Sequence, residues 1–114
     1  MDIDLSINLD EVSTVIKDFI RTYVENSSCK GVVIGLSGGV DSAVTAVLCK
    51  QALKKKNVNC LFLLDETTPE VDYKHCRLVV KKFDLQCEEK NITSVVKEVS
   101  NVCVVKPDKY ALAN

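Results

Sequence analysis

Residues 37–42, with the sequence Ser-Gly-Gly-Val-Asp-Ser, bring two hydroxyls, two glycines and a carboxylate into one short segment. They follow an apolar run at 31–36 and precede a helix-like stretch at 43–48. A glycine turn between a strand and a helix directs several backbone N–H groups to one place, where the helix dipole favours negative charge. Gly38 and Gly39 can both adopt a positive φ, and Ser37 and Ser42 add hydroxyl donors. The segment therefore favours a phosphate site over a tight connection without a ligand.

The carboxylate of Asp41 is the unexpected group in this segment, because a polyphosphate would repel it. No lysine is present, so the segment is not a Walker loop, and the chain contains no G-x-G-x-x-G dinucleotide pattern. A magnesium ion bridging Asp41 and the phosphates of ATP would remove the repulsion. Alternatively, Asp41 caps the following helix by accepting hydrogen bonds from its first N–H groups. The local chemistry favours neither role over the other.

The elements around this segment repeat in the order strand then helix. An amphipathic helix leads the chain within residues 1–28, with Asn8 as its cap and Glu11 three residues later. We expect its apolar face to pack on its own domain; that face comprises Val12, Ile16, Phe19, Ile20 and Tyr23. Within 31–102, strands buried on both faces are predicted at 31–36 and 59–64, a weaker strand at 85–89, and helices at 41–54, 69–83 and 93–102.

This order predicts an α/β fold, a parallel sheet with helices on both faces and right-handed crossovers. At 114 residues the chain is at most one domain. Doubly wound domains usually have five or more strands, so we expect these to be the first three strand-helix units of a longer domain. Residues 1–114 then form a single, incomplete domain.

Charge and apolar patterning exclude several partners. A net charge of −1 gives no electrostatic sign of nucleic-acid binding. No apolar run reaches the ~18 residues of a membrane span, and the acidic start at Met1-Asp2-Ile3-Asp4 lacks the pattern of a secretory signal, so a cytoplasmic location is expected.

The six cysteines are widely spaced in apolar segments, which indicates buried free thiols. With one histidine, a zinc site has little support.

Residues 37–42 resemble the S-G-G-x-D-S signature of the N-type ATP pyrophosphatases. The flanking residues 30–43, together with 19–24, 48–53 and the tail at 109–114, resemble NAD synthetases of that superfamily. The resemblance implies an adenine nucleotide alpha hydrolase-like, Rossmann-like fold. It also implies that ATP and its pyrophosphate are bound by Gly35, Leu36, Ser37, Gly38, Gly39, Val40, Asp41 and Ser42.

The activity implied by this resemblance is ATP-dependent amidation of deamido-NAD with ammonia, through an acyl-adenylate, with release of AMP and pyrophosphate. Asp41 would be a ligand of Mg²⁺. Only residues 1–30 precede the first predicted strand, which favours the ammonia-dependent type over the glutamine-dependent type. The family implies a homodimer, and it places the second metal ligand and most substrate contacts beyond residue 114. No catalytic residue is identified within the chain, and this part alone is expected to be inactive.

Two alternatives remain at this point. One is another N-type ATP pyrophosphatase, either tRNA-modifying or similar to GMP synthetase. The other is a non-catalytic nucleotide-binding relic of the same fold.

Overall fold

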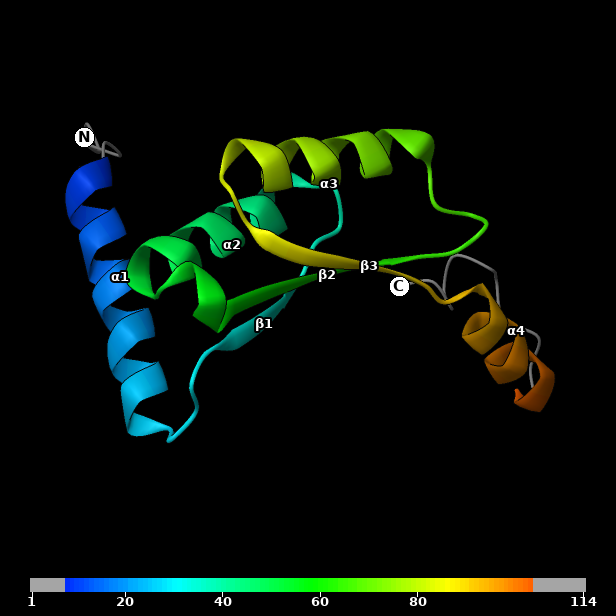
Figure 1. The fold of residues 1–114 in the computed structure, drawn as a ribbon, viewed down its shortest axis with the longest axis horizontal. Coiled ribbons are helices and arrows are strands. Elements are labelled where there is room, and N and C mark those ends of the chain that lie inside the picture. Colours follow the sequence, from blue (N-terminus) through cyan, green and yellow to red (C-terminus); the bar gives the residue numbers. More distant parts are fainter. Residues whose placement is uncertain (1–7, 104–114) are drawn as a thin grey trace, which may run out of the picture.

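The computed structural model describes residues 8–103, which form a three-stranded sheet and its associated helices (Figure 1). The order is α1 (Leu9–Asn26), β1 (Val32–Gly35), α2 (Val40–Ala52), a 3-10 turn (Lys55–Asn57), β2 (Val58–Leu64), α3 (Glu70–Lys82), β3 (Gln86–Asn91) and α4 (Thr93–Val102). Every predicted helix and strand is present, with ends that differ by a few residues. The expectations for residues 1–4 and 109–114 fall outside the described residues.

The three strands are parallel and lie side by side in the order β1-β2-β3. Val32 is opposite Val58, and Cys60 is opposite Cys87. The predicted α/β fold with a parallel sheet is therefore confirmed. Because parallel strands share one carboxyl edge, the segments that follow β1 and β2 come together at that edge, the usual ligand-binding position of such sheets.

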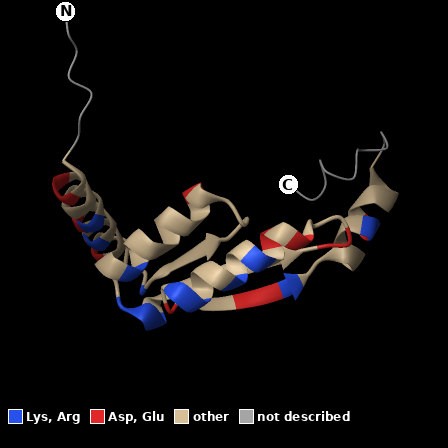
Figure 2. Cartoon of the chain, turned by 90° about the horizontal axis from the view of Figure 1, so that it is seen from above, with Lys and Arg blue, Asp and Glu red and all other residues tan. Residues whose placement is uncertain are grey.

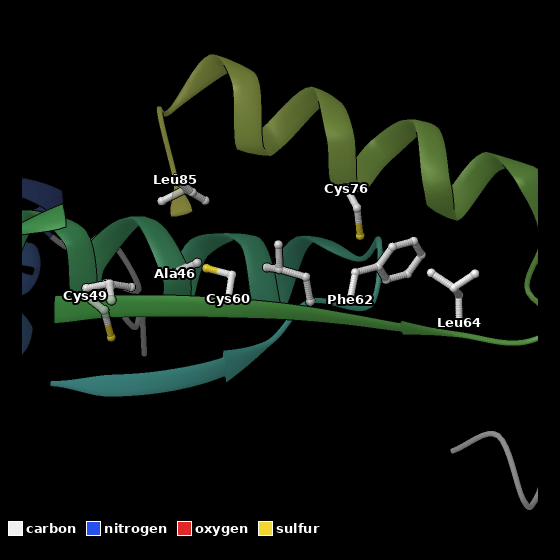
Figure 3. Packing of buried hydrophobic residues seen from close by; sticks show 9 residues of the cluster. Ala46, Cys49, Cys60, Phe62, Leu64, Cys76 and Leu85 are labelled. Atoms are coloured by element: carbon white, nitrogen blue, oxygen red, sulfur yellow. The ribbon is translucent and has the colours of Figure 1, made fainter. Parts of the chain in front are cut away.

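The core lies on one face of the sheet, under α2 and α3 (Figure 3). Burial alternates along β2, so its inward side chains come from every second residue. The buried cluster consists of Leu36, Ala46, Cys49, Val58, Cys60, Phe62, Leu64, Cys76 and Leu85. Phe62 meets the ring of Tyr73 edge-to-face at 5.3 Å between centroids, which ties α3 to the centre of the sheet.

The opposite face of the sheet is exposed at Val33 and Leu63, whose exposed fractions are 69% and 51%. The prediction that both strands are buried on two faces is wrong for these residues. Two successive right-handed crossovers that advance in the same direction place their helices on the same side of a sheet. Residues from both α2 and α3 accordingly join the same core cluster.

Helix α1 begins as predicted, since the Asn8 side chain accepts a hydrogen bond from the Glu11 N–H at 3.1 Å. It packs on α2, where Arg21 Nε donates to the Ala52 carbonyl. The expected packing of its whole apolar face is wrong, because Phe19 and Tyr23 are 66% and 67% exposed. The helix lies across one end of α2 (Figure 1), so few of its apolar side chains reach the core.

Strand β3 is an edge strand of the described sheet and carries consecutive charges at Glu88, Glu89 and Lys90 (Figure 2). Arg77 of α3 donates to both carboxylate oxygens of Glu89, at 2.8 and 3.0 Å. Charged side chains on an edge strand discourage pairing with another chain. This explains why the apolar signal of the third strand is weak.

The cysteine prediction is partly wrong. Cys49, Cys60 and Cys76 are buried, and burial raises the pKa of each thiol. Cys29 and Cys103 are exposed, because they lie just beyond the ends of α1 and α4. Within residues 8–103, no helix is both long and apolar enough for a membrane span.

Candidate functional site

The segment named here the glycine loop (residues 35–42) runs from the last residue of β1 to the first turn of α2. Its start is held by the Leu36 N–H, which donates to the Leu61 carbonyl at 2.8 Å and extends the β1–β2 ladder by one residue. Its end is the helix itself, because Gly39 is the N-cap and α2 begins at Val40. The predicted arrangement of strand, glycine turn and helix N-terminus is therefore present.

The two serines of the glycine loop hydrogen-bond across it. The Ser37 N–H donates to Ser42 Oγ at 3.1 Å, and the two hydroxyl oxygens are 3.2 Å apart. Ser37 Oγ also accepts from the Gly39 N–H at 3.3 Å. The hydroxyls predicted to face a phosphate therefore also brace the loop. The structure brings both serines to one place, as the sequence indicated.

Gly38 has a φ of +87°, the conformation for which glycine was expected. A Cβ at this position would lie 2.9 Å from the Cα of Asp72 and 3.1 Å from its Oδ1. The first turn of α3 therefore lies directly against Gly38 and leaves no room for a side chain there. Gly39 needs no such freedom, since its φ is −89°. Asp72 was not predicted as a neighbour of the loop, and its only sequence signal was a place at the start of the third predicted helix.

Asp41 lies in the first turn of α2 and is exposed. The cap of α2 is Gly39, and no side chain makes a capping hydrogen bond there, which removes the capping role considered for Asp41. Among the described residues, no set of three or more His, Cys, Asp or Glu side chains could hold a metal ion. Asp41 thus offers one exposed carboxylate, without a cluster of other candidate ligands around it in the described part of the chain.

A second segment, here named the Asp65 loop (residues 65–69), follows β2 at the same edge of the sheet. The Asp65 side chain is buried, with 5% exposed. Its Oδ1 accepts from the Thr67 hydroxyl at 2.6 Å and the Thr67 N–H at 2.8 Å. These bonds, the hydroxyl's first, hold the pKa of Asp65 below its usual value, although burial acts in the opposite direction. Sequence reasoning assigned no site residue to this loop.

A cleft of about 490 Å³ separates the glycine loop from the Asp65 loop. Its lining comprises Gly35, Leu36, Ser37, Leu61, Phe62, Leu63, Thr67, Thr68, Pro69 and Asp72. One side offers Ser37 and the backbone of the glycine loop, and the other offers apolar side chains and threonines. Asp72, from the first turn of α3, is the acidic residue in the lining. A molecule with an anionic end and a flat, less polar end matches this division. A nucleotide has that form.

A larger groove of about 610 Å³ lies between α2 and α3, and its lining is mostly apolar, including Val44, Leu78 and Phe83. It reaches the glycine loop at Gly38, Gly39 and Val40. Gly35, Leu36 and Ser37 line the smaller cleft, whereas Asp41 and Ser42 line neither the cleft nor the groove.

Comparison with known proteins identifies relatives over nearly the whole chain. Residues 12–114 match the NAD synthase family. The chain is 38% identical over 90 residues to an NH(3)-dependent NAD(+) synthetase of Methanocaldococcus jannaschii, a match covering 79% of this chain and 35% of the relative. It is 38% identical over 112 residues to the enzyme of the same description from Saccharolobus solfataricus, covering 96% of this chain and 39% of that relative.

The fold also matches solved structures. The NH3-dependent NAD synthetase of Campylobacter jejuni, in complex with the nitrate ion, superposes with a TM-score of 0.84 at 29% identity, covering 94% of this chain and 46% of that one. The NMN synthetase of Francisella tularensis, at 23% identity and a TM-score of 0.76, shares the fold. The chain thus spans less than half the length of these relatives.

Proposed function

The chain belongs to the NAD synthase family, and from this we propose that the full-length protein makes NAD from deamido-NAD, ATP and ammonia. The observation that carries the proposal is the family match over residues 12–114, and the position of the glycine loop between β1 and the N-terminus of α2 supports it. The relatives described as NH(3)-dependent support ammonia as the nitrogen source. For the whole protein we also propose a homodimer and a cytoplasmic location, as the resemblance to this family suggested.

The proposed reaction has two steps. The carboxylate of deamido-NAD attacks the α-phosphorus of ATP, which forms an acyl-adenylate and breaks the bond to pyrophosphate. Ammonia then attacks the acyl carbon, AMP leaves with the electron pair of the broken C–O bond, and the nitrogen loses a proton. Without adenylation the leaving group would be oxide. The step thus turns an unreactive carboxylate into an acyl donor.

The glycine loop would act in the first step. Backbone N–H groups at the N-terminus of α2, together with Ser37 and Ser42, would stabilise the negative charge that develops on the departing pyrophosphate. Because Gly38 is held against Asp72, the donors of the loop would be in place before the substrate binds. Preorganised donors of this kind lower the barrier without a rearrangement during the reaction.

Asp41 would hold Mg²⁺ at the same place. When bound, the ion would neutralise the phosphate charge and orient the triphosphate. The Asp41 carboxylate is suited to this because it is exposed and lies in the first turn of α2, directly after the loop. The remaining ligands of such an ion are phosphate oxygens and water.

The proposal can be tested on the full-length protein with the variant Asp41→Asn. We expect wild-type protein to release AMP from ATP only when deamido-NAD and ammonia are present. Asp41→Asn should lower that rate by about 100-fold or more, the size of effect seen when one group that stabilises charge in a transition state is removed. In parallel, Mn²⁺ titration followed by electron paramagnetic resonance should show weaker metal binding in the presence of ATP.

Asp10→Asn is a matched control, because Asp10 is also in the first turn of an α-helix but lies on α1. Its rate and metal affinity should equal those of the wild type. Consumption of ATP with a tRNA or with xanthosine monophosphate, but not with deamido-NAD, would contradict the substrate assignment and leave the ATP chemistry in place.

A further inference from the structure

Asp65 is the charged side chain that the fold buries among the described residues. Burying a carboxylate is costly unless hydrogen bonds replace the water that it loses. Asp65 sits directly after β2, at the carboxyl edge of the sheet and beside the candidate cleft. The residue before it, Leu64, is a buried apolar side chain of the core, so Asp65 is the point at which the buried chain changes from apolar to charged.

The hydrogen bonds of Asp65 all connect it to the two threonines that follow. Its Oδ1 accepts from the Thr67 hydroxyl at 2.6 Å, from the Thr67 N–H at 2.8 Å and from the Thr68 hydroxyl at 3.4 Å. Its own N–H donates to Thr68 Oγ1 at 3.0 Å, and the Thr68 N–H donates back to the Asp65 carbonyl at 3.2 Å. The carboxylate thus organises the whole turn. Bonds to a charged acceptor are stronger than those between neutral groups.

This bonding decides what the threonines present to the cleft. Thr67 and Thr68 both line it, together with Pro69. Because both hydroxyls donate to Asp65, neither is left as a hydrogen-bond donor for a ligand. The glycine loop, across the cleft, contributes Gly35, Leu36 and Ser37, and it is the loop to which the proposed function assigns the phosphates. The phosphate end of a nucleotide therefore belongs at the glycine loop, and its nucleoside end belongs at the threonines.

We propose that Asp65 is a positioning residue, which holds Thr67 and Thr68 as a fixed wall for the nucleoside part of ATP. This inference rests on the proposed function, because it takes ATP as the ligand of the cleft. Asp65 acts through the threonines and touches no substrate. Its loss should weaken binding of the nucleoside part and leave phosphate binding at the glycine loop unchanged.

The test compares MgATP with magnesium tripolyphosphate, which has the phosphates of ATP but no nucleoside. Binding of each to the full-length protein is measured by isothermal titration calorimetry. Asp65→Asn should raise the Kd for MgATP by about five- to tenfold, the effect of losing one charge-assisted hydrogen bond. Its Kd for tripolyphosphate should stay within twofold of the wild-type value. Thr67→Val removes the hydroxyl of the shortest bond but keeps the branched shape, and it should shift the two ligands in the same pattern.

Glu66→Gln is the matched control, because Glu66 is the exposed carboxylate next to Asp65. It should bind both ligands like the wild type. Unchanged MgATP affinity in both Asp65→Asn and Thr67→Val would overturn the inference, as would an equal loss for both ligands. If wild-type protein binds neither ligand, the proposed function itself fails, and that result is distinct from the other two.

Discussion

The glycine loop and the Asp65 loop occupy equivalent places, each directly after a parallel strand at the same edge of the sheet, but they are held in opposite ways. The glycine loop depends on Gly38, which is at positive φ against the first turn of α3, and on the hydrogen bonds between its two serines. The Asp65 loop depends on a buried carboxylate that bonds its own neighbours. Both loops use hydroxyls and backbone N–H groups in internal hydrogen bonds, but the carboxylate of the glycine loop, Asp41, is exposed, whereas Asp65 is buried. We infer that the first serves to bind charge and the second to present a shape.

The largest effect is expected at Gly38. If backbone shape holds the glycine loop, even the methyl group of an alanine at this position should destabilise the protein. In Gly38→Ala the new Cβ would meet the Asp72 backbone at 2.9 Å, and the residue would have to keep φ at +87°. We expect a loss of about 1–3 kcal/mol in the free energy of unfolding, measured with urea. If the loop shifts by about 1 Å, ATP-dependent turnover should fall by about 100-fold.

Gly35→Ala is the control for the stability measurement, since no atom lies within 4 Å of a Cβ built there. It should destabilise the protein clearly less than Gly38→Ala. Equal losses in the two variants would mean that the contact with α3 does not hold the glycine loop in shape.

The next largest effect concerns the charge in the Asp65 loop. Asp65→Asn keeps the shape of the side chain but removes the charge, and should lower the free energy of unfolding by about 1–2 kcal/mol at pH 7. The pKa of Asp65 is lowered in the folded protein, chiefly by the Thr67 hydroxyl. Its contribution is therefore complete above the unfolded-state pKa of about 3.9 and is lost as the pH falls through the lower, folded-state value.

Urea unfolding of wild type and Asp65→Asn at a series of pH values measures this difference directly. The two stabilities should converge on acidification. Glu66→Gln provides the comparison with an exposed carboxylate. A gap between wild type and Asp65→Asn that did not depend on pH would indicate that shape, not charge, holds the Asp65 loop.

The smallest effect on stability is expected for the pair Ser37 and Ser42. A substitution in this pair tests whether its hydroxyls only hold the glycine loop in shape or also bind a phosphate. Ser42→Ala removes the acceptor of the Ser37 N–H at 3.1 Å and should cost about 1 kcal/mol or less, because the pair is exposed to water. Thr45→Val is the control, since its hydroxyl bonds only to a carbonyl of its own helix, that of Asp41. A loss of ATP affinity well beyond the loss of stability in Ser42→Ala would favour direct binding of a phosphate by this hydroxyl.

Much of the site could be predicted because its signals are local. The run at 31–36 predicted a strand, and the glycines with the following helix pattern predicted the anion-binding turn. The Asn8 cap was also predictable, since a capping side chain and its N–H donor are three residues apart. No site residue was assigned to the Asp65 loop, although its bonds are equally local. An aspartate followed by two threonines is common in solvated turns, and only burial shows that its hydrogen bonds are needed.

Residue order alone determined the repeat of strand and helix, the glycine turn between β1 and α2, and the family that these residues resemble. The tertiary structure decided which distant residues contact that turn and which lie on the other side of the cleft. Asp72 supports Gly38 from more than thirty residues further along the chain, and Asp65 places two threonines on the far wall of the cleft. It also decided that α2 and α3 share one face of the sheet, which leaves Val33 exposed. The physical reason is that local patterns report hydrogen bonding and periodicity within a segment, whereas the direction and handedness of crossovers bring distant segments together.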